Sequence, residues 1–447
     1  MSKLMLSVSG MRGVVGDTLD PLLVVKMGNA FGRWAANGTV VVGGDTRPSH
    51  AMVKSAVIAG LTSAGASVID IGIVPTPTVQ QAVRFHGAAG GVVVTASHNP
   101  EQWNGIKLMN ASGSFLEPDE YDAVMSAYAE ESLLAQPWDH VGSVTLDSAA
   151  ISRHVDVILS ALDCGKLPES KLRVLIDVNH GAAAVADPIL FQKLGVSVDF
   201  LESEPDGRFA HEPEPLEKNL SALCEAMRSG NYDIGFAQDP DADRLVIVDE
   251  KGRFIGEDYS LGLCIDYILQ TVGGQSPQVV VNLSTSRVIE DIVQRYGGSV
   301  SYTKIGEAHV TQGLKKRQAV VGGEGNGGVI YPKVGWGRDS LVGIVIALKY
   351  LAESGKSVSE IVSEYPSYVM LREKQALATP ELLSQQLDTM KRVFSDGVLD
   401  LQDGVKSMYS DSWIHLRPSN TEPIVRIFVE APTVEAARVL LDRAIYA

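Results

Sequence analysis

The sequence predicts an α/β protein made of three related α/β units followed by a smaller α+β unit. Segments with the patterns of strands and helices alternate through most of the 447 residues, which is typical of parallel or mixed sheets covered by helices. An apolar strand, a short polar turn and a helix recur as one unit three times. After about Tyr365 the alternation gives way to short strands with two helices.

Length and composition limit the classes of protein to which the chain can belong. A chain of 447 residues has room for two to four domains. Its 45% hydrophobic and 21% charged residues are typical of a soluble globular protein. No apolar run is long enough to cross a bilayer, and residues 1–6 lack the apolar core of a signal peptide. The three cysteines are far apart, so we expect no disulfide framework and a cytoplasmic location.

The charge restricts the partners. A formal net charge of −16 argues against nucleic acid, which needs a basic face. It does not argue against a phosphorylated small molecule, because a few arginines can make a local anion site. We therefore expect neither nucleic acid nor a membrane as a partner.

Each of the three α/β units has its own apolar strand. These strands are expected at residues 39–42, 172–176 and 278–281. The helix of the first unit is expected at 51–64, followed by strands at 67–71 and 91–94, and the third helix starts at Arg287. The repetition suggests three related domains, although any α/β protein contains this unit.

The last unit differs in pattern. An amphipathic helix is expected at residues 380–394 and a closing helix at 434–444, among short strands. The changes of pattern place the domains at residues 1–148, 149–255, 256–365 and 366–447.

A serine stands at the end of an apolar strand. The strand at residues 91–94 runs into Ser97, His98, Asn99 and Pro100, and Lys107 follows shortly after. A serine presented there, next to a histidine and a lysine, is placed like a nucleophile or a phosphate carrier. An ordinary turn at the end of a strand explains the same residues equally well.

Three carboxylates alternate in one loop between two expected strands. Asp239, Asp241 and Asp243 repel one another unless a cation lies among them, and oxygen ligands suit Mg²⁺. An EF-hand is excluded because Arg244 stands where its loop needs glycine, and a strand follows. Arg244 adds a guanidinium that suits a phosphate oxygen. A solvated acidic turn is the alternative.

Two further loops carry polar groups. The stretch from residue 322 to 328 matches a dinucleotide-binding pattern formally, but a strand follows it rather than a helix, so we reject a dinucleotide site. We interpret it as a flexible loop that presents Glu324 and Asn326 to sugar hydroxyls. Residues 417–423, which include Arg417, Ser419, Asn420 and Thr421, offer the donors that a phosphate dianion needs. A glycine-rich hairpin and a plain polar turn are the alternatives.

Together these loops resemble the motifs of the α-D-phosphohexomutase superfamily, in the family's order and over essentially the whole chain. The resemblance starts at Ser9 to Gly13 and includes residues 104–107. It implies four domains around a central cleft, the first three related, and a phosphosugar substrate.

The resemblance also implies roles at the matching positions. Ser97 is the expected phosphoserine. Mg²⁺ is expected on the serine phosphate and the three aspartates, with a hexose 1,6-bisphosphate as activator. Arg12, His98, Lys107 and Arg244 are expected to act in catalysis, without a choice of the general acid or base. The sugar and its phosphate are expected to bind Glu324, Asn326, Arg417, Ser419, Asn420, Thr421 and Arg426.

The reaction that this resemblance implies moves a phosphoryl group between the 6- and 1-positions of a hexose, through a bisphosphate intermediate. The family often has Ser at the position of Asn326, and phosphoglucosamine mutases commonly have Gly at that of Asn420. The residues of the motifs nevertheless favour glucosamine 6-phosphate as the substrate, with phosphomannomutase/phosphoglucomutase activity as the alternative. Remoter alternatives are a phosphatase or phosphotransferase with Asp239 as nucleophile, and a non-catalytic sugar-phosphate binding protein. A monomer or homodimer is expected.

Overall fold

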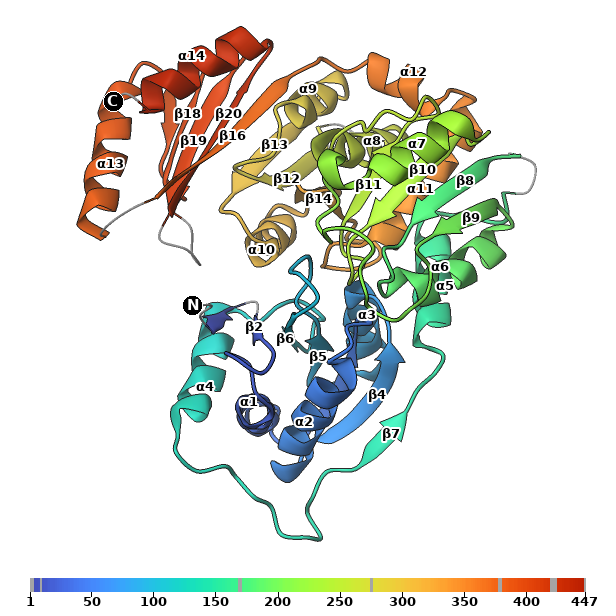
Figure 1. Cartoon of the computed structure of the whole chain (residues 1–447), viewed down its shortest axis with the longest axis vertical. Coiled ribbons are helices and arrows are strands. Elements are labelled where there is room, and N and C mark those ends of the chain that lie inside the picture. The colour runs from blue at the N-terminus through green and yellow to red at the C-terminus, as the bar shows by residue number, and fades with distance from the viewer. Residues whose placement is uncertain are drawn as a thin grey trace. The chain divides into compact units, whose positions relative to one another are not determined.

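The structure is a computed structural model (Figure 1) and describes residues 4–8, 10–167, 171–273, 276–376, 380–418 and 424–445. The contacts divide the chain into two compact units. Unit 1 contains residues 1–260 and 327–360, and unit 2 contains residues 261–326 and 361–447.

The first sheet of unit 1 is mixed, as the sequence predicts. In the described part of the chain its order is β1-β2-β6-β5-β3-β4-β7. Strands β3, β4, β5 and β7 run parallel, β6 is antiparallel to both of its neighbours, β5 and β2, and β1 is antiparallel to β2. The strands are β1 (Met5–Ser7), β2 (Gly10–Val14), β3 (Thr39–Gly44), β4 (Ser67–Ile73), β5 (Gly90–Val94), β6 (Trp103–Asn110) and β7 (Val144–Leu146).

The described residues of this first α/β domain form four helices. They are α1 (Pro21–Trp34), α2 (His50–Ser63), α3 (Thr76–His86) and α4 (Pro118–Ala129). The Asp20 side chain accepts a hydrogen bond from the Leu23 amide at the start of α1, a common N-cap. Strand β5 is buried on both faces, as expected of a valine-rich strand inside a parallel sheet. Because β3 and β5 are parallel, the loops that follow them leave the same edge of the sheet.

A second mixed sheet of unit 1 has the order β11-β10-β8-β9 among the described residues. Strands β8, β9 and β10 are parallel, and β11 is antiparallel to β10. The elements of this domain are α5 (Ala150–Ala161), β8 (Arg173–Asp177), α6 (Ala183–Leu194), β9 (Ser197–Leu201), the 3₁₀ turn η2 (Glu217–Asn219), α7 (Ser221–Ser229), β10 (Ile234–Gln238) and β11 (Leu245–Val248). The acidic loop predicted at 239–243 connects two neighbouring antiparallel strands.

The third α/β domain contributes to both units. Strands β13, β12 and β14 of unit 2 are parallel neighbours. The elements are α8 (Glu257–Val272), β12 (Gln278–Asn282), α9 (Val288–Arg295), β13 (Ser299–Thr303), α10 (Glu307–Arg317), β14 (Val321–Glu324), β15 (Gly328–Ile330), α11 (Ser340–Ser354) and α12 (Val358–Ser363). Asp339 caps α11 by accepting hydrogen bonds from the Leu341 and Val342 amides.

The C-terminal domain of unit 2 is the predicted α+β domain. Its antiparallel sheet has the order β16-β20-β19-β18-β17 among the described residues. The elements are β16 (Val369–Ala376), α13 (Pro380–Val393), β17 (Val398–Asp400), β18 (Val405–Met408), β19 (Trp413–Pro418), β20 (Ile424–Ala431) and α14 (Val434–Ile445). The two helices lie on one face of the sheet (Figure 1) and share its apolar core.

These observations confirm an α/β protein with mixed sheets and a different C-terminal domain. The predicted domain boundaries and central cleft remain predictions. The three cysteines lie in the described part of the chain, where they are buried and form no disulfide. In the described part of the chain, no helix is long and apolar enough to span a bilayer.

Candidate functional site

The serine loop follows β5 and folds back in a tight turn. Ser97 is buried, and its backbone lies in the left-handed region with φ of 52°. Residues other than glycine rarely adopt this backbone conformation. It is found where surrounding contacts enforce it, often at functional sites. The Ser97 amide donates to Thr95 Oγ1 at 2.8 Å, and the Asn99 amide donates to the Ala96 carbonyl at 3.1 Å.

Arg47 is the main contact that enforces this shape. Its guanidinium is fully buried and donates hydrogen bonds to four backbone carbonyls of the loop. The acceptors are the carbonyls of Ser97, Asn99 and Pro100, each at 2.6 Å, and of Trp103 at 2.8 Å. Asp45 balances the charge of Arg47 at 3.2 Å and accepts from Thr95 Oγ1 at 2.5 Å. The loop after β3 therefore shapes the serine loop after β5.

Arg47 is not among the functional residues predicted from the sequence. The available signal was a charged Asp-Thr-Arg turn at the end of an apolar strand, the same place that Ser97 occupies after its own strand. The parallel pairing of β3 with β5, which brings the two turns together, is a long-range feature.

The acidic loop brings Asp239, Asp241 and Asp243 together. All three are fully buried, and one oxygen from each lies within 4.8 Å of the others. The Asp243 and Arg244 amides each donate to Asp239 Oδ1 at 3.1 Å. Strand β11 follows the loop, which agrees with the rejection of an EF-hand.

Three cations face these carboxylates. Lys107 Nζ donates to Asp241 Oδ2 at 2.6 Å and to Asp243 Oδ2 at 3.1 Å. Arg338 donates to Asp243 Oδ2 at 2.7 Å, and Arg244 Nε lies 3.7 Å from Asp239 Oδ2. Arg338 lies just before α11 and was not predicted; its only sequence signal is a charged pair, Arg338 and Asp339, ahead of an apolar helix.

Burial and close contact between charged groups shift the pKa values of the residues in this cluster. Burial and the charges of Asp243 and Asp241 hold the pKa of Asp239 well above its usual range. Burial also acts to raise the pKa of Asp243, but Arg338, Lys107 and Arg244 outweigh it and hold the pKa below its usual range. Burial acts to lower the pKa of Lys107, yet the two aspartates raise it, so Lys107 keeps its proton.

Ser97 borders this cluster. Its Oγ lies 3.4 Å from Asp239 Oδ2 and 3.3 Å from His98 Nδ1. Arg244 Nη2 donates to His98 Nδ1 at 3.0 Å, and its charge, together with burial, holds the pKa of His98 well below its usual range. His98 is thus a neutral ring with Nδ1 as an acceptor. Arg12 is joined to the serine loop through Asn99 Oδ1 at 3.3 Å.

The structure thus collects one group of predicted residues in unit 1. These are Arg12, Ser97, His98, Lys107, Asp239, Asp241, Asp243 and Arg244. The arrangement offers a buried hydroxyl beside carboxylate oxygens and a surplus of hydrogen-bond donors, which suits the transfer of an anionic group.

A second group lies in unit 2. Glu324 is the last residue of β14 rather than part of a flexible loop, so this detail of the prediction was wrong. Its Oε1 accepts from Asn282 Nδ2 at 2.9 Å and from the Gly306 amide at 3.0 Å. The neighbouring parallel strand β12 ends at Asn282 and thereby orients Glu324. Asn326 lies in the short turn after it.

Arg417 and Arg426 are cross-strand partners in the same unit. They are directly opposite in the β19–β20 pair, so their side chains share one face. Like charges in this position destabilise a sheet unless an anion or an acid lies between them. Asp403 lies 3.5 Å from Arg417 Nε. Burial lowers the pKa of Arg417 from its ordinary value. Ser419, Asn420 and Thr421, and Ser9 of the first motif, lie outside the described residues.

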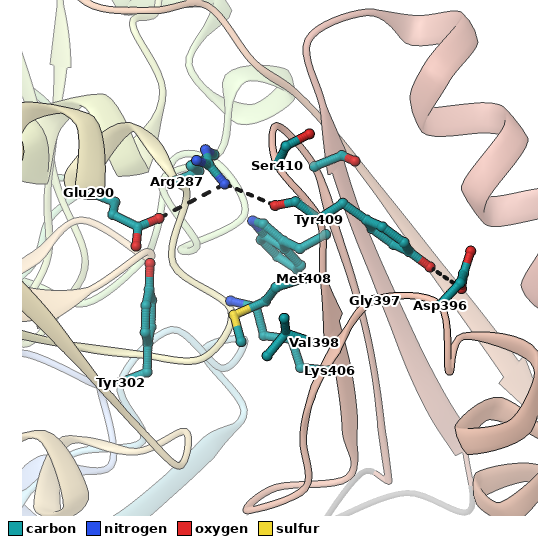
Figure 2. A pocket seen from close by; sticks show the side chains of 12 residues that line it. Arg287, Glu290, Tyr302, Asp396, Gly397, Val398, Lys406, Met408, Tyr409 and Ser410 are labelled. Atoms are coloured by element: carbon teal, nitrogen blue, oxygen red, sulfur yellow. Dashed lines mark hydrogen bonds and ion pairs between the residues drawn. The ribbon is translucent and has the colours of Figure 1, made fainter.

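A separate cavity of about 670 Å³ lies in unit 2, between the third and fourth domains (Figure 2). Lys406 Nζ lies 4.6 Å and 4.3 Å from the ring centroids of Tyr302 and Trp413, and Arg287 donates to the Tyr409 carbonyl at 3.3 Å. Among its described lining residues, none is a predicted site residue.

Comparisons with known proteins show the family of the chain. Four family models, described as phosphoglucomutase/phosphomannomutase alpha/beta/alpha domains I, II and III and C-terminal domain, match residues 3–135, 152–252, 256–368 and 372–445. A probable phosphoglucosamine mutase of Methanopyrus kandleri is 37% identical over 97% of this chain and 95% of its own. A phosphoglucomutase/phosphomannomutase of Thermococcus kodakarensis is 36% identical over 98% of this chain and 96% of its own.

Solved structures share the fold. A phosphoglucomutase/phosphomannomutase family protein of Burkholderia thailandensis has a TM-score of 0.86 and 28% identity, over 99% of this chain and 98% of its own. An N-acetylphosphoglucosamine mutase of Aspergillus fumigatus, solved in complex with GlcNAc-6P and magnesium, has a TM-score of 0.60 at 16% identity, over 98% and 94%. The chain therefore belongs to the phosphoglucomutase/phosphomannomutase family and is a phosphohexomutase.

Proposed function

We propose that this phosphohexomutase interconverts glucosamine 6-phosphate and glucosamine 1-phosphate, with Ser97 as the phosphorylated residue. The observation that carries the assignment of Ser97 is its position: a buried hydroxyl in a strained turn, 3.4 Å from a carboxylate of the acidic cluster. Four hydrogen bonds from Arg47 keep the turn in place, so the hydroxyl is held rather than free to rotate away with its loop.

The acidic loop is the proposed Mg²⁺ site. Asp241 Oδ1 and Asp243 Oδ1 are buried and have no hydrogen-bond partner among the described residues. Such orphan carboxylate oxygens are costly unless a cation binds them, and an all-oxygen set suits Mg²⁺. The three aspartates would hold the ion together with the Ser97 phosphate. Bound there, Mg²⁺ supplies charge neutralisation for the transferring group.

The surrounding cations suit phosphoryl transfer. The transferring group needs in-line positioning and charge stabilisation rather than covalent chemistry. Arg244, Arg338 and Lys107 reach the acidic cluster from separate elements, and Arg12 approaches through the serine loop. His98, Lys107 and Arg12 are the candidates for the proton transfer that the attacking hydroxyl needs; His98 Nδ1 lies 3.3 Å from Ser97 Oγ, and Lys107 Nζ lies among the aspartates.

Unit 2 supplies the proposed substrate contacts. The paired Arg417 and Arg426 form a concentration of positive charge on one face of a sheet, which suits the phosphate that is not reacting. Ser419, Asn420 and Thr421 would complete this anion site. Glu324, held by Asn282 and the Gly306 amide, presents a fixed carboxylate to a sugar hydroxyl or amine, with Asn326 beside it.

The amino sugar is proposed because of the relatives. Several chains 34–37% identical to this one are named probable phosphoglucosamine mutase. The relative named phosphoglucomutase/phosphomannomutase is 36% identical, so phosphomannose and phosphoglucose are the second candidates. A carboxylate such as Glu324 favours an ammonium group over a hydroxyl at the same sugar carbon.

The test compares kcat/KM for the phosphates of glucosamine, mannose and glucose. Each assay contains Mg²⁺ and the corresponding hexose 1,6-bisphosphate, so that the serine can be phosphorylated. We expect a preference of at least about tenfold for glucosamine, the usual size of one charge-assisted hydrogen bond. Equal rates on mannose and glucose phosphates, with little turnover of glucosamine phosphate, would assign the second candidate instead.

A further inference from the structure

The carboxyl group of Asp187 lacks a hydrogen-bond donor. Asp187 is fully buried in α6, and among the described residues neither of its side-chain oxygens receives a hydrogen bond. The Gln238 side chain, at the end of β10, acts directly on the Asp187 carboxyl, and its buried Oε1 also lacks a donor among the described residues. Two adjacent groups that only accept hydrogen bonds leave both unsatisfied, which is costly in a protein interior.

The other atom of the Gln238 amide leads to the acidic loop. Gln238 Nε2 donates to Ser340 Oγ at 2.8 Å, and Ser340 Oγ donates to the Ala242 carbonyl at 2.6 Å. Ala242 lies between Asp241 and Asp243, and its backbone is left-handed with φ of 53°. An alanine in this conformation is strained and needs contacts that hold it. The Ser340 hydroxyl provides one.

We propose that Asp187 is a positioning residue, which as a neutral acid donates a hydrogen bond to Gln238 and so holds the acidic loop in shape through Ser340. The proton on one Asp187 oxygen satisfies Gln238 Oε1. Gln238 Nε2 is then available to Ser340 Oγ, and the Ser340 hydrogen to the Ala242 carbonyl. The inference rests on the proposed function, because it concerns the loop to which the metal is assigned.

Loss of that proton would reverse the relay, that is, the chain of hydrogen bonds from Asp187 through Gln238 and Ser340 to the Ala242 carbonyl. An ionised Asp187 attracts the amide nitrogen of Gln238, so the amide turns over and presents Oε1 to Ser340. Ser340 Oγ then donates to Gln238 instead of Ala242. The Ala242 carbonyl keeps only the longer contact from the Ser340 amide, at 3.4 Å. The protonation of Asp187 is therefore coupled to the shape of the loop that carries Asp241 and Asp243.

The surroundings of Asp187 favour the neutral form. Burial raises the pKa of Asp187 to about 8; the Gln238 amide opposes this shift, and the charge of Asp339, the N-cap of α11, adds to it. Helix α5, which packs against α6, brings His154, whose ring is bonded to Asp339 Oδ2 and Thr78 Oγ1. The Lys193–Asp156 pair between these helices has an exposed acid. Below pH about 8 the carboxyl keeps its proton, and above it the relay reverses.

The experiment compares Asp187→Asn with Asp187→Leu in the full chain. Asparagine keeps a side-chain N–H donor for Gln238 Oε1, whereas leucine fills the space without one. Isothermal titration with Mg²⁺ at about pH 7 measures the affinity of each variant. We expect Asp187→Asn to bind within about twofold of the parent protein and Asp187→Leu about tenfold more weakly, the usual effect of one hydrogen bond.

Two further measurements test the inference independently: the pH dependence of Mg²⁺ affinity and infrared difference spectra. Between about pH 7 and about pH 9 the Mg²⁺ affinity of the parent protein should fall relative to that of Asp187→Asn, which has no proton to lose. Infrared difference spectra of the parent protein minus Asp187→Asn, which need no metal, should contain the carbonyl band of a protonated carboxylic acid at neutral pH. This second reading applies even if Asp187→Leu does not fold.

The inference is overturned if Asp187→Leu binds Mg²⁺ as the parent protein does, if Asp187→Asn loses as much affinity as Asp187→Leu, or if the infrared band is absent. Failure of the parent protein to bind Mg²⁺ at all would instead count against the proposed metal site, and the infrared band would then decide the state of Asp187 alone.

Discussion

Ser97 is the residue on which the proposed chemistry depends. Replacement of Ser97 by Ala should abolish mutase turnover, because it removes the hydroxyl that lies beside Asp239 and is proposed to carry the phosphate. The backbone contacts of the turn do not involve Oγ, so the fold should persist. Turnover and the melting temperature measure the two effects separately.

A matched control is Ser407→Ala. Ser407 is also buried, and its Oγ donates to the Phe394 carbonyl in the C-terminal domain. This variant should lose some stability, about 1 kcal/mol for one buried hydrogen bond, and keep its turnover. Full activity of Ser97→Ala would remove Ser97 from the role of phosphate carrier.

Arg47 tests whether the shape of the serine loop matters apart from its chemistry. A lysine at this position has one ammonium group and cannot reach four carbonyls that lie around a planar guanidinium. Arg47→Lys should therefore leave buried carbonyls unsatisfied and cost about 2–4 kcal/mol of unfolding free energy.

Turnover should fall further than stability alone explains in Arg47→Lys, because Ser97 leaves its strained turn. Urea unfolding and kcat at a temperature where the variant is folded separate the two. Unchanged kcat in the folded variant would mean that the loop keeps its shape without the guanidinium.

At the scale of elements, the pairing of strands decides which loops meet. The strand–turn–helix pattern of the sequence located β3, β5 and β10 and the turns that follow them. It could not show that the turns after β3 and β5 share an edge, because that depends on parallel pairing between segments about fifty residues apart. Ser97 was consequently predicted, whereas Arg47, which shapes its loop, was missed.

Long-range contacts also explain the other differences. Arg338 reaches Asp243 across 95 positions of sequence, and no local pattern indicates such a distance. Glycines around Glu324 suggested a flexible loop, yet Glu324 ends a strand because β14 pairs with β12. Asp187 gave no signal either: an acid in an alanine-rich helix resembles an exposed residue until the packing around it is known.

The β19–β20 pair carries the third prediction. Arg417 and Arg426 are opposite each other. In the proposed site both contact the phosphate of the substrate, and neither contacts the sugar ring. Arg417→Ala should therefore raise KM for the glucosamine, mannose and glucose phosphates by a similar factor, about tenfold or more for a charge-assisted contact. Its effect on stability combines relief of the like-charge pair with Arg426 and loss of the ion pair with Asp403, so stability is measured separately from KM.

Steady-state kinetics on the three sugars check this prediction, with urea unfolding alongside. A loss confined to one sugar would contradict a role in phosphate binding, and would point to direct contact with the ring.

At the scale of the whole molecule, each unit contains a buried neutral histidine. His50 lies in α2 of unit 1, and His415 lies in β19 of unit 2. Burial lowers the pKa of His50 and of His415 to about 4 in each case. His415 Nε2 donates to the Asp403 carbonyl at 2.6 Å, which leaves Nδ1 to accept from Ser284 Oγ at 2.9 Å. This contact ties the third domain to the fourth within unit 2.

Both histidines should make the protein sensitive to acid. A histidine in the unfolded chain has a pKa of about 6.5. Between pH about 6.5 and about 4 the two imidazoles therefore bind protons in the unfolded chain but not in the folded protein. Stability is therefore complete above pH about 6.5 and falls as the pH drops through this window. In unit 2, protonation of Nδ1 also requires the loss of the Ser284 hydrogen bond.

The last prediction uses His415→Gln, which keeps a donor for the Asp403 carbonyl but cannot take up a proton. Calorimetric melting from about pH 7 to about pH 4 should show a smaller loss of stability in this variant than in the parent protein, by up to about 3 kcal/mol. His140→Gln, at an exposed position, is the control for the effect of the substitution itself. If His415→Gln and the parent protein lose stability in parallel, the buried ring is not the acid-sensitive contact, and the junction of the third and fourth domains must weaken through another group.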